Sequence, residues 1–185
     1  KQFPQQFAYE PVIENASVLK KTTKFIVAGM GGSPLPAGVL QIAHPELDLV
    51  IHKDYDLPLR PAAEYEKGLV IVISYSGNTE ETVSALTQAL EKKYPCGVIA
   101  AGGLLLTMAR ERAIPYIQLP DTGIQPRMAT AFMLKAMAKM MGCPSIYHLR
   151  KSRLNVVKIL FSDKSMKYSK LYRNGKFQEE VSYLR

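Results

Sequence analysis

Short apolar runs alternate along the chain with segments whose apolar residues recur at helical spacing. The runs predict β-strands near residues 25–29, 48–52, 69–74, 96–101 and 115–119. The other segments predict helices near residues 34–43, 78–93, 104–112 and 127–141. Strands that alternate with helices form parallel sheets with helices on both faces. The pattern therefore predicts an α/β fold, a three-layer αβα sandwich with a five-stranded parallel sheet.

Two segments do not follow this alternation. Residues 11–21 predict a further helix before the first strand, with Val12, Ala16 and Leu19 near one face. Residues 54–68 are polar and contain two prolines. Because proline interrupts regular elements, they predict an irregular connection in place of one crossover helix.

The turn after the third predicted strand carries three hydroxyl side chains, on Ser74, Ser76 and Thr79. The free N–H groups at the start of the next helix attract an anion, and the hydroxyls add donors. The turn contains no lysine, so its neutral donors suit a phosphate monoester better than a nucleoside triphosphate with magnesium. The alternative is a plain helix cap by Ser76 or Asn78, with the two following glutamates complementing the helix dipole.

A glycine-rich turn follows the first predicted strand, with Gly-Met-Gly-Gly-Ser at 29–33. It is not a dinucleotide fingerprint, because Pro34 stands where the third glycine belongs. It is not a Walker loop either, because no Lys-Ser or Lys-Thr follows the glycines. The alternatives are a ligand-binding turn and a tight strand–helix connection. Parallel sheets bind ligands at the carboxyl ends of their strands, so this turn, the serine turn and the segment around Arg127 are expected to converge.

Three segments occur together and in order: 29–33, 74–79 and Leu-Pro-Asp-Thr-Gly-Ile-Gln-Pro-Arg at 119–127. Together with the segments Phe-Pro-Gln-Gln at 3–6 and Val-Ile-His-Lys-Asp-Tyr at 50–55, they resemble the sugar isomerase (SIS) domain of the bifunctional phosphoglucose/phosphomannose isomerases. The resemblance implies a flavodoxin-like domain and a sugar-phosphate substrate. It also implies a phosphate held at the serine turn, and an arginine near the reacting end of the sugar.

The resemblance covers about residues 1–145, and it assigns residues 146–185 to a C-terminal extension. Arg127 is the candidate catalytic residue, through a contact to the enediolate or to a sugar oxygen. The implied substrate-binding residues are Gly32, Ser33, Ser74, Ser76, Thr79 and Arg127.

The catalytic base has no assigned residue. The resemblance places a glutamate, a histidine and a lysine in a second SIS domain, and 185 residues do not hold two such domains. Glu80, Glu81, His148, Glu179 and Glu180 match no catalytic segment. Two functions therefore stay open. One is a phosphoglucose/phosphomannose isomerase completed by another subunit, and the other is a non-catalytic sugar-phosphate binding or regulatory domain.

Most of the net charge of +8 lies in residues 151–185, which hold nine Lys and Arg against three Asp and Glu. Asn174-Gly175 predicts a hairpin in this basic extension. A basic segment can contact nucleic acid, but no arginine-rich helix or stacking motif supports that partner. A solvated basic face is the favoured interpretation.

The remaining composition excludes several classes. No apolar run approaches the ~20 residues of a membrane span, and no secretory leader pattern opens the chain. Cys96 and Cys143 lack metal-ligand spacing, so we expect no metal and a cytoplasmic location. We also expect no cofactor. Residues 127–141 are rich in methionine, which is typical of a core or an oligomer face. We expect a homodimer.

Overall fold

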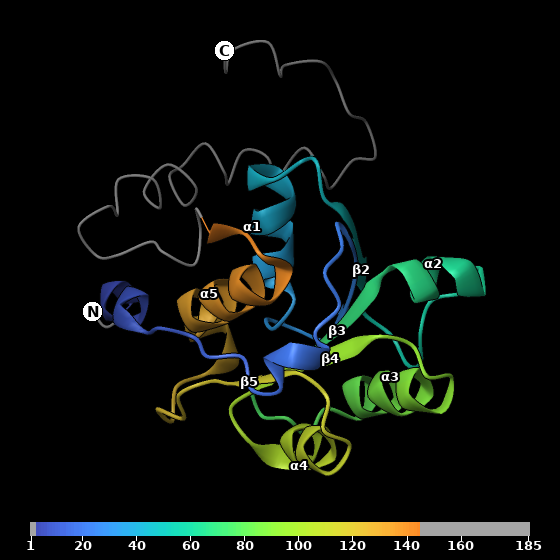
Figure 1. Ribbon diagram of the computed structural model, residues 1–185. Helices are drawn as coiled ribbons and strands as arrows, with labels where there is room; N and C mark the ends of the chain where they lie inside the picture. Colours follow the sequence, from blue (N-terminus) through green and yellow to red (C-terminus); the bar gives the residue numbers. More distant parts are fainter. Residues whose placement is uncertain (1–2, 145–185) are drawn as a thin grey trace. The chain divides into compact units, whose positions relative to one another are not determined.

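The computed structural model describes residues 3–144, and within them a single sheet of five strands forms the centre of the fold (Figure 1). The strands run parallel in the order β2-β1-β3-β4-β5. All five predicted strands are confirmed. Their bounds are β1 (Lys24–Gly29), β2 (Asp48–His52), β3 (Leu69–Ile73), β4 (Cys96–Ala100) and β5 (Tyr116–Gln118).

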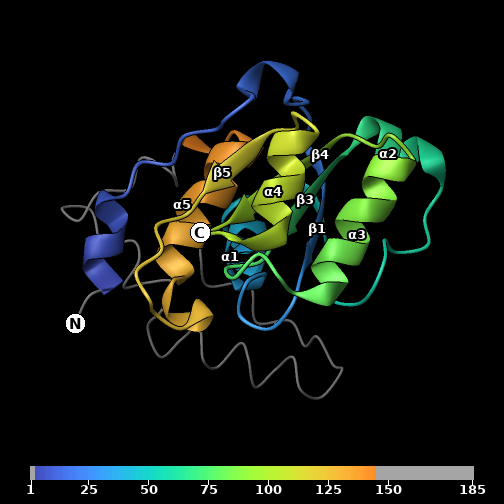
Figure 2. The same ribbon diagram turned by 90° about the horizontal axis from the view of Figure 1, so that it is seen from below.

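Helices cover both faces of this sheet. α1 and α5 pack together on one face, and α2, α3 and α4 lie on the other, as Figure 2 shows. Every residue of β3 and β4 is buried, which agrees with the continuous apolar runs expected of central parallel strands. The predicted three-layer sandwich is confirmed. The helices are α1 (Leu35–Ala43), α2 (Ala62–Lys67), α3 (Glu80–Glu91), α4 (Gly103–Glu111) and α5 (Thr130–Met141).

The helix predicted for residues 11–21 is wrong, because only a 3-10 turn at Ala16–Val18 forms there. The backbone of Glu14 instead pairs antiparallel with Tyr116, with N···O distances of 2.9 and 3.2 Å. Asn15 has φ of 55° and donates its side-chain amide to the carbonyl of Ile114. The segment thus covers the edge of β5, and this long-range pairing overrides the local helical pattern.

Two other boundaries differ from the sequence prediction. The connection 54–68 was expected to be irregular throughout. It contains the short helix α2, which starts after Pro61. The last helix begins at Thr130 and is preceded by a 3-10 turn, Pro126–Met128, so Arg127 lies before the helix and not in its first turn. The predicted hairpin at Asn174-Gly175 lies outside the described residues, as does the whole of the predicted extension 146–185.

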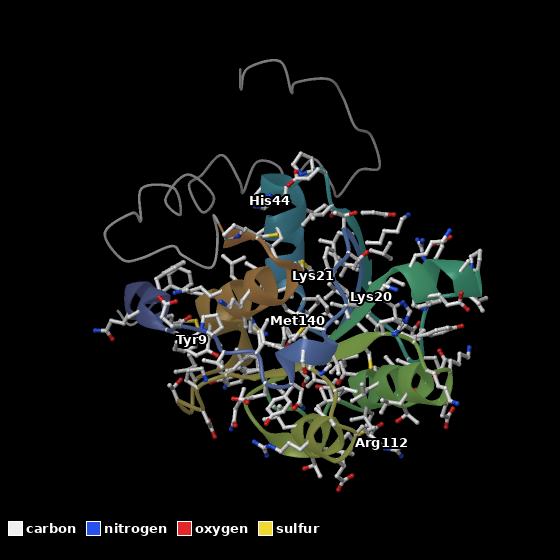
Figure 3. All side chains as sticks on the ribbon, viewed as in Figure 1. Tyr9, Lys20, Lys21, His44, Arg112 and Met140 are labelled. Atoms are coloured by element: carbon white, nitrogen blue, oxygen red, sulfur yellow. The ribbon has the colours of Figure 1, made fainter. Side chains whose placement is uncertain are left out.

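The methionines of α5 are buried within the chain. Met133 and Met137 have no exposed surface, and Met140 packs against β4 at Gly97 (Figure 3). The core alternative for this helix is therefore confirmed. Because these side chains are not exposed, α5 does not supply the apolar surface from which a dimer was expected, and the homodimer stays a prediction.

The N-terminal segment is fastened to α5. Lys135 is fully buried on that helix, and its Nζ donates to the carbonyl of Phe7 at 2.9 Å and pairs with Glu10 at 3.1 Å. Tyr9 packs edge-to-face on Phe132 with ring centroids 5.5 Å apart (Figure 3). A buried ammonium requires such partners, because burying an unpaired charge is very costly.

Candidate functional site

The turns that follow β1 and β3 leave neighbouring parallel strands at the same edge of the sheet. From β1 the chain continues to β2 on one side, whereas β3 continues to β4 and β5 on the other side. This is the topological switch point, where the connections diverge and open α/β sheets bind ligands. The glycine turn, residues 29–33, and the serine turn, residues 74–79, both lie there.

The three hydroxyls of the serine turn form one connected group. Ser74 Oγ lies 2.8 Å from Thr79 Oγ1 and 3.4 Å from Ser76 Oγ. Ser74 Oγ also accepts a hydrogen bond from the backbone N–H of Gly77 at 3.2 Å. Ser74 is buried, while Ser76 is exposed. The group thus reaches from the interior to the surface and can turn its protons toward an acceptor.

The start of α3 adds backbone donors. Thr79 is the N-cap residue, and its side chain makes no capping hydrogen bond to the helix. The N–H groups of Glu80 and Glu81 occupy the first helical turn, where intrahelical acceptors are absent. The expected cap by Ser76 or Asn78 is wrong. Asn78 Oδ1 instead accepts from the N–H of Leu104 at 2.9 Å, so it caps α4.

The serine turn is locked against the turn that follows β4. Gly77 has φ of +75°, and a Cβ added there would lie 1.8 Å from the carbonyl oxygen of Gly102. Its own carbonyl accepts from the N–H of Leu105 at 3.0 Å. A side chain at this position would clash with backbone, so the close approach requires glycine. The serine turn is therefore fixed both by its packing against Gly102 and by its hydrogen bond to Leu105.

Ser33 and Tyr75 connect the two turns. The Ser33 hydroxyl is buried and accepts a hydrogen bond from the N–H of Tyr75 at 3.3 Å. The Tyr75 phenol donates to the carbonyl of Pro120 at 3.0 Å. Sequence analysis did not single out Tyr75, although a large aromatic residue between two serines of a polar turn is a usable signal. Ser33 thus reaches the serine turn, as expected.

Gly32 holds Arg127 beside the glycine turn. A Cβ added at Gly32 would lie 3.1–3.2 Å from the N, Cα and Cβ atoms of Arg127. The Arg127 carbonyl accepts from Thr130 Oγ1 at 2.7 Å. Its guanidinium is exposed and makes no hydrogen bond or ion pair with any residue between 3 and 144. The backbone of Arg127 is therefore fixed, while its guanidinium is free to contact a ligand.

Three other titratable residues between 3 and 144 have hydrogen-bond partners of their own, whereas the candidates His148, Glu179 and Glu180 lie outside the described residues. Glu80 accepts a hydrogen bond from the phenol of Tyr55 at 3.1 Å, which raises the pKa of Tyr55. His52 bonds to the carbonyl of Tyr55, and His44 pairs with Glu46 at the far end of α1. Within the described residues, no group of three or more His, Cys, Asp or Glu side chains is placed to hold a metal ion.

Both cysteines are buried, as their isolated positions predict. Burial raises the pKa of Cys96 to about 11 and also raises the pKa of Cys143. A thiol held protonated in this way is a poor nucleophile. No helix in residues 3–144 is long and apolar enough to cross a membrane.

The fold and the site together define an α/β domain with a doubly covered parallel sheet and a polar, glycine-rich edge at its switch point. No protein-family model matches the chain. Among curated relatives, the bifunctional phosphoglucose/phosphomannose isomerase of Thermoplasma volcanium is 36% identical, over 62% of this chain and 35% of its own. That of Caldicellulosiruptor bescii is also 36% identical, over 69% of this chain and 38% of its own.

The structural comparison agrees on the fold. A candidate sugar-phosphate isomerase from Listeria monocytogenes aligns with a TM-score of 0.52 and 18% identity, over 77% of this chain and 79% of its own. On the sequence and structural matches together, the chain belongs to the sugar isomerase (SIS) domain family. It spans well under half the length of the curated relatives that it matches.

Proposed function

We propose that the chain is a sugar-phosphate isomerase domain that binds glucose 6-phosphate, fructose 6-phosphate or mannose 6-phosphate in the switch-point crevice. One observation carries the proposal: Gly32 brings an unpaired arginine beside a turn that presents three hydroxyls and a free helix N-terminus. The relatives' shared activity on hexose phosphates supports this substrate class. We also propose that residues 1–145 form the domain and that 146–185 are an extension.

The phosphate would be held by neutral donors. Ser74, Ser76 and Thr79 supply hydroxyl protons, and the first amides of α3 supply N–H groups with the positive end of the helix dipole. Ser33 lies against the same turn and can donate its remaining proton. Hydrogen bonds to a charged acceptor are each worth about 1.5–3 kcal/mol, so a few of them hold a small ligand.

The sugar would extend from this turn toward Arg127. Aldose–ketose isomerisation moves a proton between neighbouring carbons through an enediolate, whose oxygen carries developing negative charge. A guanidinium is always protonated and presents donors in a plane, so Arg127 can bind a sugar oxygen and stabilise that charge. For the same reason it cannot act as the base.

The base is expected from outside this crevice. Glu80 is exposed and engaged by Tyr55, and His52 is turned toward the Tyr55 carbonyl. A general base contributes typically about 10²–10⁴-fold and must lie within about 3 Å of the proton it removes. These positions fit both candidate functions, an isomerase whose base comes from another subunit and a sugar-phosphate binding or regulatory domain without catalysis of its own.

A coupled assay separates the two functions. The 185-residue chain is expected to bind fructose 6-phosphate in calorimetry but to convert it to glucose 6-phosphate or mannose 6-phosphate weakly or not at all. Turnover at ordinary enzyme rates that one Glu→Gln or His→Asn change abolishes would show that this chain contains the base. If no hexose phosphate binds at millimolar concentration, the proposed function is wrong.

A further inference from the structure

Gln6 joins the N-terminal segment to the residues that flank Arg127. Its side chain is buried, although glutamine is ordinarily a surface residue. The Nε2 group donates to the carbonyl of Met128 at 2.7 Å, and Oε1 accepts from the N–H of Ala131 at 3.1 Å. Both polar ends of one side chain therefore bond to the backbone just after Arg127, more than 120 residues away in sequence.

These bonds provide a cap that the local sequence lacks. The N-cap of α5 is Ala129, which has no side-chain acceptor for the first amides of the helix. Gln6 satisfies one of these amides and also fixes the carbonyl of the 3-10 turn Pro126–Met128. The turn and the helix are thereby held in one fixed relation by a residue from outside both.

The same turn is restrained from its other side. Gly32 packs against the backbone of Arg127, and Thr130 Oγ1 donates to its carbonyl at 2.7 Å. The restraints from Gly32, Thr130 and Gln6 all act on backbone, and none of them contacts the guanidinium. These contacts fix the backbone position from which the Arg127 side chain extends, whereas a free 3-10 turn would let that position vary.

We infer that Gln6 is a positioning residue for Arg127, which it aims into the sugar-phosphate crevice. The inference rests on the proposed function, in which Arg127 contacts the sugar and the serine turn holds the phosphate. A displacement of about 1 Å in such a group can cost up to about 10²-fold. Losing Gln6 should therefore weaken the sugar contact and leave the phosphate contact intact.

A double-mutant cycle in the full 185-residue chain tests this. Gln6→Ala, Arg127→Ala and the double variant are titrated with fructose 6-phosphate and, separately, with inorganic phosphate. We expect Gln6→Ala to raise the Kd for fructose 6-phosphate by about three- to thirtyfold, within the ~10²-fold limit given above, and the double variant to lose little more than Arg127→Ala alone. The Kd for inorganic phosphate should change less than twofold in all three.

Glu10→Gln is the matched control. It lies in the same N-terminal segment and weakens the attachment to α5 through Lys135, without contacting the turn at Arg127. It should lower thermal stability but leave both Kd values unchanged. Gln6→Met is the second variant if Gln6→Ala fails to fold. It keeps the size of the buried side chain without adding a charge and removes both hydrogen bonds, so it should show the same selective loss.

Three outcomes overturn the inference. An unchanged Kd for fructose 6-phosphate in the Gln6 variants would show that Gln6 does not act on the site. Additive losses in the cycle would show that Gln6 and Arg127 act independently. In both cases binding by the unmodified chain, and with it the proposed function, would stand. Absence of fructose 6-phosphate binding in the unmodified chain would overturn the proposed function and the inference together.

Discussion

The serine turn offers the sharpest test of the site, through the double change Ser76→Ala and Thr79→Val. Valine keeps the shape of threonine and removes only its hydroxyl. The buried bond from Gly77 to Ser74 Oγ stays intact, so the turn should keep its conformation. The variant therefore removes two anion donors and leaves the third, on Ser74.

The expected loss follows from what each hydroxyl does without ligand. Thr79 Oγ1 lies 2.8 Å from Ser74 Oγ, so it exchanges an internal bond of about 0.5–1.5 kcal/mol for a bond to the anion of about 1.5–3. Ser76 is exposed and exchanges a bond to water. Together the two should contribute about 1.5–4 kcal/mol. Each 1.4 kcal/mol is a factor of ten, so the Kd should rise about 10- to 10³-fold.

Isothermal titration with fructose 6-phosphate measures this directly. The control is Ser17→Ala with Thr87→Val, because Ser17 is exposed in the N-terminal segment and Thr87 lies about 12 Å further along α3. The control should bind as the unmodified chain does. Equal affinity in the test and control variants, with both folded by circular dichroism, would refute the assignment of the anion site to this turn.

Three further predictions concern the fold and its assembly. Gly77→Ala should destabilise the chain by clearly more than the ~1–2 kcal/mol of a left-handed residue, because its Cβ meets the Gly102 carbonyl. Gly123 has φ of +67° and open space around it, so Gly123→Ala should lose only about 1–2 kcal/mol of unfolding free energy. Urea unfolding of both variants measures this, and equal losses would contradict the prediction. Cys96 and Cys143 should react with a thiol reagent at pH 8 only after unfolding, since burial raises both pKa values, and rapid native labelling would be inconsistent with this. Light scattering at tens of micromolar should give a homodimer, and a folded monomer would contradict that expectation.

The sheet was predictable because its signal is local. Each strand is a short apolar run, and the run Leu69–Ile73 is buried along its whole length. Such a run can be recognised without knowing which strands lie next to it. The segment 11–21 was mispredicted because its conformation is decided by pairing of Glu14 with Tyr116, about 100 residues away, and no local pattern reports such a partner. The six residues of α2 follow proline, which usually indicates a loop but is also accepted where a helix starts.

The candidate site was predictable to the extent that topology determines it. Turns that leave the carboxyl ends of parallel strands lie at the same edge of the sheet, so Ser33, the serine turn and the segment of Arg127 could be grouped from sequence. The partners of individual side chains could not be predicted. Asn78 caps α4 although it directly precedes α3, and Gln6 contacts residues 128 and 131. The hydrogen-bond partners of Asn78 and Gln6 are neighbours only in the folded structure, so the spacing of residues in the sequence does not reveal them.

The attachment of the N-terminal segment to α5 also has a consequence for how the chain acquires its site. Contacts between Gln6 and residues 128 and 131, and between Phe7 and Lys135, close loops of more than 120 residues. Contacts so distant in sequence form late, and at about 5–20 residues per second a ribosome completes the serine turn seconds before it reaches Lys135. During synthesis the serine turn can therefore form first, and the backbone around Arg127 is the last part of the candidate site to be fixed.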